Sequence, residues 1–499
     1  MIKKKKRAEK LEKIEKKPSK TKEKKTKKKH VMGPIEFTFN FISLVFMIGL
    51  GLYFGGRSLY YYSKQNMKIK EEAQTINGLI VQNNALAKEN TDGLHQDNDG
   101  YYFKGNVDNN YVIYENRLFR VMRVNNDDTV KMISEGFATS FMWGDTSNYE
   151  NSNMQNWLNK NDNEHSGVYY NTLSNVEKSL VKTAYEESIL KDGKIISLEE
   201  LEEENSEEKE EVKDTAKKEK KSKKEEKKKK DYITLLTVKD YTLANGKSSY
   251  LNNGKIFYLL GLNEDKENLY VEEDGSIQST DSTSGYGVRP VITLKKNTEV
   301  ASGTGTKEDP YIINSKSKSY VDSYVKLGDD TWKVSGIEGD NLRLYLNGYI
   351  NAGGEVTRSY SSYNSIYNIN DRTNVGNYLN YSYLGSLPYQ GSLVDCNFYT
   401  GEISDDTSYN FTNIYSNTVT AKVGLLNIFD YVGNNELSDY FHINKTSEVG
   451  SMEYNTYSNG LLEEADVRDV KHIVPVVCIN KDSIKNGDGS LNNPYKMEW

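Results

Sequence analysis

An internal duplication constrains the fold of this 499-residue chain more than any other sequence feature. Four short motifs occur twice in the same order, and a repeat of this kind identifies a folding unit without reference to other proteins. The last motif is the most specific, because it pairs four of the seven prolines at nearly the same spacing. The motif pairs are 110–121 with 323–334, 156–159 with 377–380, 234–241 with 424–431, and 288–311 with 473–495.

The duplication also sets the predicted domain boundaries. The first repeat is expected to span residues 97–314 and the second residues 318–499. The first repeat contains a charged insert, 198–230, that begins acidic, ends basic and is nearly devoid of apolar residues. Such a segment cannot bury a core, so we expect a solvated helix or loop there.

Each repeat opens with alternating apolar and polar residues around turn sequences, a pattern typical of antiparallel hairpins. Each then passes through a short polar helical stretch and closes with apolar strands. The predicted fold class is therefore α+β, with an N-terminal transmembrane helix and a helical stalk followed by two related strand-dominated domains.

The N-terminus is expected to anchor the chain in a membrane. A lysine-rich tail, residues 1–33, precedes a predicted signal anchor at 34–62, in which residues 37–54 carry no charge. A stretch of this length approaches the thickness of the hydrocarbon core, and the positive-inside rule places the tail in the cytoplasm. The alternative, a cleaved signal peptide, lacks a good small-residue cleavage site. The predicted location is the cell membrane, with a single pass and the C-terminal bulk extracellular.

Residues 63–96 are predicted to form the helical stalk. Ile69, Ile76 and Asn83 lie seven residues apart, with Leu79 and Leu86 in the offset register, as in a short heptad pattern. An asparagine at such a position can fix a two-stranded coiled coil, so a homodimer through the stalk is one interpretation. The other is a monomeric amphipathic connector.

The net charge of −7 combines a basic N-terminus with an acidic remainder. An acidic surface repels nucleic acid, so no nucleic-acid partner is expected outside the membrane.

The motifs resemble a family of uncharacterised bacterial surface modules that occur in tandem behind a signal anchor. The resemblance is carried by Trp157-Leu158-Asn159, by Gly287-Val288-Arg289-Pro290 and by the glycine-rich segment that follows. More distantly, the closing strand is similar to that of the formylglycine-generating-enzyme and C-type-lectin-like superfamily, which implies a C-type-lectin-like fold for both domains. The second repeat departs from the pattern, because Val474 replaces the arginine. The resemblance implies surface exposure and, if lectin-like, binding of carbohydrate or protein.

No set of residues in the sequence predicts a reaction centre. The five histidines show no metal-ligand spacing, no nucleophile elbow occurs, and the first repeat has no cysteine. We therefore predict a non-enzyme with no catalytic residue, no metal site and no cofactor. Residues 303–306 are expected to form a glycine-rich turn rather than a phosphate loop. Residues 97–100 are expected to form a turn, with an irregular calcium site as the alternative.

Several residues are predicted to have structural roles. Arg289 is expected to be buried and paired with a carboxylate. Cys396 and Cys478 form a disulfide in an oxidising exterior if their geometry permits, and the alternative is Cys478 as a small core residue. The other predicted structural residues are Trp157, Asn159, Pro290 and Pro475.

A segment of the second repeat, 357–419, is dense in tyrosine, serine and asparagine, a composition that suits binding surfaces. The candidate ligand-binding residues are Tyr360, Tyr363, Tyr367 and Tyr381, although AT-rich codon usage also explains the composition. The predicted function is a non-enzymatic, membrane-anchored surface protein for adhesion, binding a cell-wall glycan or a host or surface protein. The alternative is a bitopic envelope scaffold or signal transducer that links an outer event to the basic tail.

Overall fold

The computed structural model describes residues 45, 47–61, 64, 75–185, 187–197, 200, 229–314, 319–403, 410–446, 452–456 and 458–497. The chain divides into two compact units, residues 1–69 and residues 70–499. The basic tail, residues 1–33, and most of the charged insert, residues 201–228, lie outside the described residues.

In the first unit, residues 47–61 are helical. None of the helices formed by the described residues is long and apolar enough to cross a membrane. The predicted fold class, which includes a transmembrane helix, is therefore wrong. The physical reason that the described residues give is that 47–61 contains the charged Arg57 and four glycines, which make this helix less apolar than a membrane span. Residues 37–44 of the predicted anchor lie outside the described residues.

Within the described part of the predicted helical stalk, residue 64 and residues 76–83 are helical, whereas residues 84–96 are not, so the prediction of a continuous helix up to residue 96 is wrong. Helix α2 (Ile76–Asn83) is followed by strand β1 (Gly93–Asp97). Ile76 and Ile80 are fully buried in the core of the second unit, and the amide of Asn83 donates to the hydroxyl of Tyr311 at 3.0 Å. The heptad spacing thus reflects one apolar helix face that packs on the chain's own sheet, and these side chains are committed to contacts within the chain.

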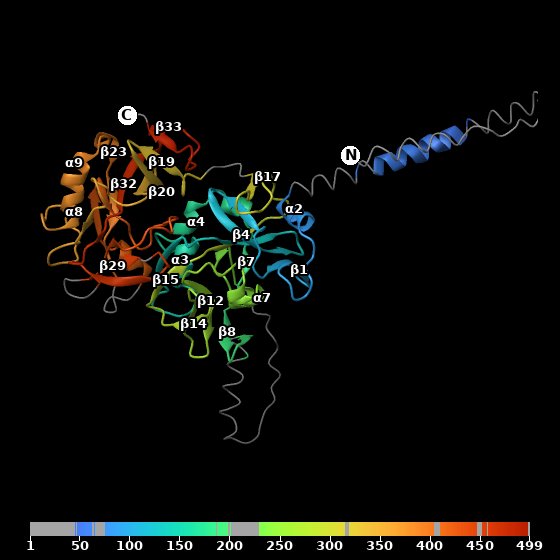
Figure 1. Cartoon of the computed structure of the whole chain (residues 1–499), viewed down its shortest axis with the longest axis horizontal. Helices are drawn as coiled ribbons and strands as arrows, with labels where there is room; N and C mark the ends of the chain where they lie inside the picture. The colour runs from blue at the N-terminus through green and yellow to red at the C-terminus, as the bar shows by residue number, and fades with distance from the viewer. Residues whose placement is uncertain are drawn as a thin grey trace, which may run out of the picture. The chain divides into compact units, whose positions relative to one another are not determined.

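The first repeat is built on an antiparallel-rich sheet around the long strand β4 (Figure 1). The hairpin of β1 and β2 (Gly100–Lys104) adds to this sheet through pairing of β2 with β4. The remaining strands, in spatial order, are β11 (Ile233–Thr234), β16 (Val291–Leu294), β5 (Val130–Ser134), β4 (Arg117–Asn125), β3 (Tyr111–Tyr114), β18 (Tyr311–Ile313) and β17 (Val300–Ser302).

The second repeat contains a sheet with the same strand order and the same pairing directions. In both sheets the long central strand shifts register at the same place, between Val121 and Arg123 in β4 and between Val334 and Gly336 in β20. The strands that correspond to β11, β16, β5, β4, β3, β18 and β17 are β27 (Val423–Leu425), β32 (Pro475–Asn480), β21 (Asn341–Leu346), β20 (Asp330–Glu338), β19 (Tyr324–Leu327), β34 (Tyr495–Met497) and β33 (Ile484–Asn486), and β23 (Leu393–Val394) also pairs with β32.

A third sheet contains strands of both repeats. Its continuity depends on β15 (Gly285–Val288) of the first repeat, which pairs with β30 (Leu462–Asp466) of the second. The spatial order is β14 (Ile277–Thr280), β13 (Asn268–Val271), β12 (Phe257–Asn263), β15, β30, β29 (Met452–Thr456), β28 (Tyr440–Thr446), β31 (Lys471–His472) and β22 (Thr357–Arg358), with β6 (Thr139–Met142), β8 (Ser188–Lys191), β9 (Lys194–Ser197) and β25 (Glu402–Ile403) at the sides.

Short helices and two small ribbons complete the described structure. The ribbons pair β7 (Thr183–Ala184) with β10 (Lys230–Asp231), and β24 (Cys396–Tyr399) with β26 (Thr418–Ala421). The helices are α3 (Asn153–Leu158), α4 (Val168–Thr172), α5 (Val176–Ser179), α7 (Val238–Leu243), α8 (Val375–Asn377), α9 (Leu384–Ser386), the π-helix η2 (Tyr378–Tyr383), and the 3-10 helices η1 (Gly246–Ser248), η3 (Gln390–Ser392), η4 (Phe411–Tyr415) and η5 (Lys481–Ser483).

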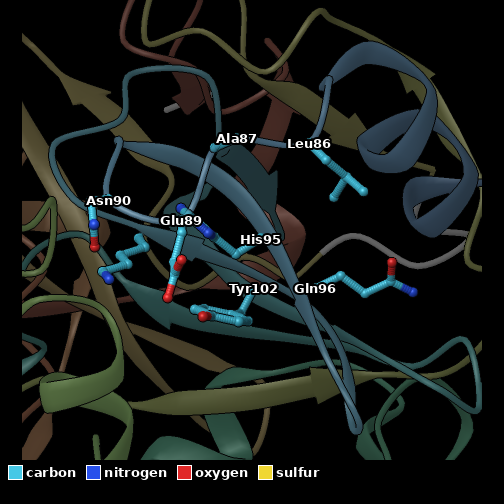
Figure 2. A pocket seen from close by; sticks show the side chains of 8 residues that line it. Leu86, Ala87, Glu89, Asn90, His95, Gln96 and Tyr102 are labelled. Atoms are coloured by element: carbon cyan, nitrogen blue, oxygen red, sulfur yellow. The ribbon is translucent and has the colours of Figure 1, made fainter.

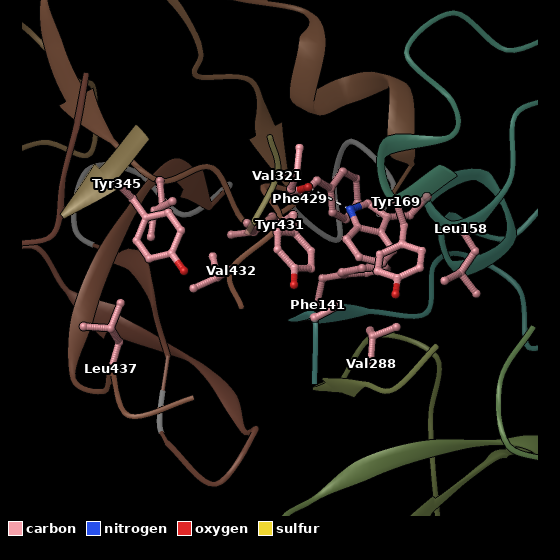
Figure 3. Packing of buried hydrophobic residues seen from close by; sticks show 14 of the residues in the cluster. Phe141, Leu158, Tyr169, Val288, Val321, Tyr345, Phe429, Tyr431, Val432 and Leu437 are labelled. Atoms are coloured by element: carbon pink, nitrogen blue, oxygen red, sulfur yellow. Dashed lines mark hydrogen bonds between the residues drawn. The ribbon is translucent and has the colours of Figure 1, made fainter. Parts of the chain in front are cut away.

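Aromatic side chains of both repeats pack into one core at the junction between the repeats (Figure 3). The rings of Phe141 and Phe429 lie 4.7 Å apart, and the buried indole of Trp157 donates to the main-chain oxygen of Phe429 at 2.7 Å. Because buried aromatic contacts and a satisfied indole N–H both favour association, the repeats stabilise each other. Residues 70–499, which include both predicted repeats, accordingly form one compact unit.

Candidate functional site

Asn159 has a structural role that recurs in the second repeat. Its amide donates to the main-chain oxygen of Ile233 at 2.7 Å and its side-chain oxygen accepts from Ile233 N at 3.1 Å. Asn380 makes the same pair of bonds with Val423, at 2.8 and 3.2 Å. Each asparagine therefore bonds both main-chain groups of one strand residue, and a tyrosine hydroxyl, of Tyr149 or Tyr367, also donates to the same main-chain oxygen.

Arg289 is buried, as predicted, but its partners differ from those expected. Its guanidinium donates to the main-chain oxygens of Ser134 at 3.0 Å and Leu251 at 2.6 Å, and it lies 4.6 Å from the ring centre of Phe257. In the described part of the chain it forms no ion pair with a carboxylate. Burial lowers the pKa of Arg289 to about 10, which is the expected direction for a cation in an apolar setting. The role is structural, because both acceptors are main-chain groups of the core.

The predicted prolines lie at the start of the equivalent strands β16 and β32, with Pro290 just before β16 and Pro475 as the first residue of β32. The main-chain oxygen of Pro290 accepts from Ser134 N at 2.9 Å, and Pro475 begins β32 opposite Leu425. The start of a strand is a position that tolerates a residue without an N–H donor.

Cys396 and Cys478 are joined by a disulfide. Their Cα atoms lie 5.6 Å apart, and the bond links β24 to the closing strand β32. Both cysteines are buried, so the disulfide has a structural role. Its presence favours an oxidising compartment.

The glycine-rich segments form matching turns. Gly303 and Gly305 have φ angles of +101° and +91°, and Gly487 and Gly489 have +95° and +80°. A side chain at Gly303 would collide with the main-chain oxygen of Pro310, so only glycine fits. The repetition of this geometry indicates a turn that both repeats need, rather than a phosphate-binding loop.

The Asp97–Gly100 segment is the turn of the β1–β2 hairpin. The carboxylate of Asp97 pairs with Arg123 at 2.6 Å, and this bond lowers the pKa of Asp97. Across the described residues no group of three histidine, cysteine, aspartate or glutamate side chains has the geometry of a metal site.

The four candidate tyrosines do not share one surface. Tyr360 and Tyr367 are core residues, 0% and 3% exposed, and the hydroxyl of Tyr367 donates to Val423 O at 2.8 Å. Their predicted role in ligand binding is therefore wrong, because a buried ring offers no stacking face. Tyr363 and Tyr381 are each 63% exposed.

The exposed pair lies on two segments that contact each other, and we call Tyr363, Ile366 and Tyr381 together the tyrosine surface. Ile366 is 58% exposed. The loop that carries Tyr363 and Ile366 packs on the helical segment that carries Tyr381, because the hydroxyl of Tyr367 lies 3.3 Å from the amide of Asn380. Large apolar side chains exposed to this degree on neighbouring segments are typical of binding surfaces.

Hydrogen bonds hold this loop in one conformation. The amide of Asn374 donates to Ile366 O at 2.8 Å, and its oxygen accepts from Asn368 N at 3.1 Å. Asn374 also caps the following helix through Gly376 N at 2.9 Å. One buried asparagine thus fixes both the loop and the start of the helix.

The ring of Tyr363 is held by its hydroxyl, which donates to Asp371 at 2.6 Å. This bond raises the pKa of Tyr363 and lowers that of Asp371, so at neutral pH the phenol keeps its proton and the carboxylate stays charged. The ring is then both exposed and oriented, which reduces the entropy lost when a ligand stacks on it.

A second concave region lies at the N-terminal side of the first repeat (Figure 2). This groove, of about 490 Å³, is lined by Glu89, His95, Tyr102 and Lys104 among others. His95 Nε2 lies 2.8 Å from the main-chain oxygen of Thr91. A carbonyl oxygen can only accept a hydrogen bond, so Nε2 carries a proton. The ring of Tyr102 stacks on His95 at 5.6 Å. The groove presents groups of both charges to solvent, and sequence reasoning missed it because residues 86–104 have no counterpart in the second repeat.

No protein-family model, no curated protein and no solved structure matches this chain.

Proposed function

We propose that this chain is an extracytoplasmic binding protein whose second repeat binds glycans through the tyrosine surface. The observation that carries the proposal is the exposed ring of Tyr363, held in place by Asp371. The disulfide between Cys396 and Cys478 supports a location in an oxidising compartment. The proposed activity is binding and not catalysis.

A glycan suits this surface because sugars combine apolar ring faces with many hydroxyl groups. The rings of Tyr363 and Tyr381 offer faces for stacking. Polar side chains on the same loop, including the exposed Asn370 and Arg372, offer donors and acceptors for hydroxyl groups. Tyrosine and asparagine supply these contacts at low cost in side-chain entropy.

The test is binding of the full chain to a glycan array and to isolated cell-wall polysaccharide. We expect the wild-type chain to bind, and the Y363A/Y381A variant to lose about tenfold or more in affinity because two stacking faces are removed. Y363F keeps the ring and loses only the bond to Asp371, so a smaller loss is expected.

The matched control is L491A, since Leu491 is 59% exposed but lies in the final glycine-rich turn. Its binding should equal that of the wild type. Absence of binding by the wild type, or equal binding by the double tyrosine variant, would refute the proposal.

A further inference from the structure

One edge of the central strand is occupied in the first repeat and open in the second. In the first repeat, β2 pairs with the end of β4, with Gly100 opposite Asn125 and Tyr101 opposite Val124. The equivalent positions of β20 are Glu338 and Ile337, because Phe119 corresponds to Trp332 in both sheet registers. Within the described residues β20 pairs only with β19 and β21, and neither covers this edge. We call residues 336–338 the β20 edge.

The hydrogen-bonding groups at this edge follow from the first repeat. Asn125 N donates to Thr129 O, on the side of β5. Successive residues of a strand direct their main-chain groups to opposite edges, so the N–H and C=O of Val124 face β2. By the same register, the N–H and C=O of Ile337 face outward, and none of the described strands lies beside them.

The burial of side chains differs in the same way. Val124, which has β2 beside it, is 3% exposed, whereas Ile337 is 44% exposed. A Cβ atom added at Gly336 would meet nothing within 4 Å. The exposure of Ile337 agrees with an edge that none of the described strands covers.

The central strand carries a cation, Arg123, at this edge in the first repeat and an anion, Glu338, in the second. In the first repeat Arg123 of the central strand pairs with Asp97 of the hairpin at 2.6 Å. In the second repeat Gly336 replaces this arginine, and Glu338 stands where the first repeat has Asn125. Burial raises the pKa of Glu338 despite Arg343 at 3.7 Å, so a further cation would stabilise its carboxylate.

We propose that the β20 edge takes up an extended, basic segment of a partner protein as an added antiparallel strand. Strand addition of this kind obtains affinity from main-chain hydrogen bonds and specificity from alternate side chains. The hairpin of the first repeat shows the register that the added strand would follow, with one residue opposite Ile337 and a cation near Glu338.

The experiment uses the full chain and two labelled six-residue peptides, one of alternating lysine and valine and one of alternating glutamate and valine. Fluorescence anisotropy should show about tenfold tighter binding of the lysine peptide. Hydrogen exchange at the Ile337 amide should slow when this peptide is bound.

The decisive variant is I337P, which removes the outward N–H at an edge position that tolerates proline. It should weaken binding of the lysine peptide by about tenfold or more. The matched control is I337T, which keeps the N–H and a β-branched side chain and should bind nearly as well as the wild type. Y363A/Y381A should also bind normally, since the tyrosine surface is a different site.

Three results would overturn the proposal. The first is unchanged peptide binding by I337P, and the second is equal binding of the lysine and glutamate peptides. The third is a wild-type dimer that I337P converts to monomer, because the occupant would then be a second copy of this chain.

Discussion

The hydroxyl of Thr183 lies 2.8 Å from that of Thr293, at the position that the disulfide Cys396–Cys478 occupies in the second repeat. The equivalence follows from the sheet register, since Leu180 pairs with Leu294 as Leu393 pairs with Ile479. One repeat therefore links its short ribbon to the closing strand by a hydrogen bond, and the other by a covalent bond.

Replacing the disulfide by the threonine pair of the first repeat should measure its contribution. The C396T/C478T variant should unfold with a free energy about 4 kcal/mol lower, because the disulfide closes a loop of 82 residues in the unfolded chain. Urea denaturation followed by circular dichroism measures the change. Dithiothreitol should destabilise the wild type and leave this variant unaffected, and equal sensitivity of both would contradict the prediction.

The two equivalent asparagines should differ in their contribution to stability. N159A should lower the free energy of unfolding by about 2 kcal/mol, because it leaves the buried N–H of Ile233 without its acceptor, while the C=O keeps the hydroxyl of Tyr149. N380A should cost less, because Asn380 is half-buried and water can replace its amide. Urea midpoints of the two variants test the order, and a larger loss for N380A would show that burial does not control the cost.

The ion pairs of the equivalent strands β5 and β21 form a second matched set. Lys131 contacts Asp240 at 2.6 Å in the first repeat, and Arg343 contacts Asp430 at 3.1 Å in the second. D240N should cost about 2 kcal/mol, because it leaves the partly buried ammonium of Lys131 without its carboxylate. D430N should cost less, since Arg343 keeps Glu338 and the main-chain oxygen of Asn397. Thermal unfolding of both variants at low and high salt measures the difference.

His442 should make the protein less stable in mild acid. Burial lowers its pKa from 6.5 to about 4, although main-chain oxygens of Leu426 and Asn427 favour the charged form. Between these two pH values the unfolded chain binds a proton that the folded chain does not, so stability falls as the pH falls. This loss of stability is absent above pH 6.5, the pKa of the unfolded state, and reaches about 3 kcal/mol near pH 4.

The variant H442Q should remove this contribution. Its free energy of unfolding, measured in urea from pH 7 to pH 4, should decline less steeply than that of the wild type. Parallel curves for the two proteins would show that His442 takes up its proton equally in both states.

Self-comparison of the sequence located the motifs that occupy equivalent places in the two sheets. It succeeded because residues such as Asn159 and Gly303 satisfy main-chain geometry, and each repeat needs the same residue type for the same purpose. The heptad spacing of Ile76 and Asn83 led to the prediction of a stalk helix. An apolar helix face has the same period whether it packs on a second helix or on a sheet, so the spacing does not distinguish the two.

The remaining site residues depended on contacts between distant segments. Arg289 binds Ser134 and Leu251, and both acceptors are main-chain oxygens, which no side-chain pattern reveals. The tyrosines of 357–383 carry no periodic pattern, so nothing in the sequence separates the buried Tyr367 from the exposed Tyr363. The open β20 edge follows only from comparing the two sheets.

The pairing of β15 with β30 has a consequence for how the chain can be shortened. Gly285 lies beside Leu462, and a side chain at Gly285 would collide with that leucine. A fragment that ends between the repeats would leave this glycine-lined strand bare, together with the aromatic residues around Trp157. Such a fragment should self-associate in solution, so natural or engineered boundaries in this chain are expected to keep both copies together.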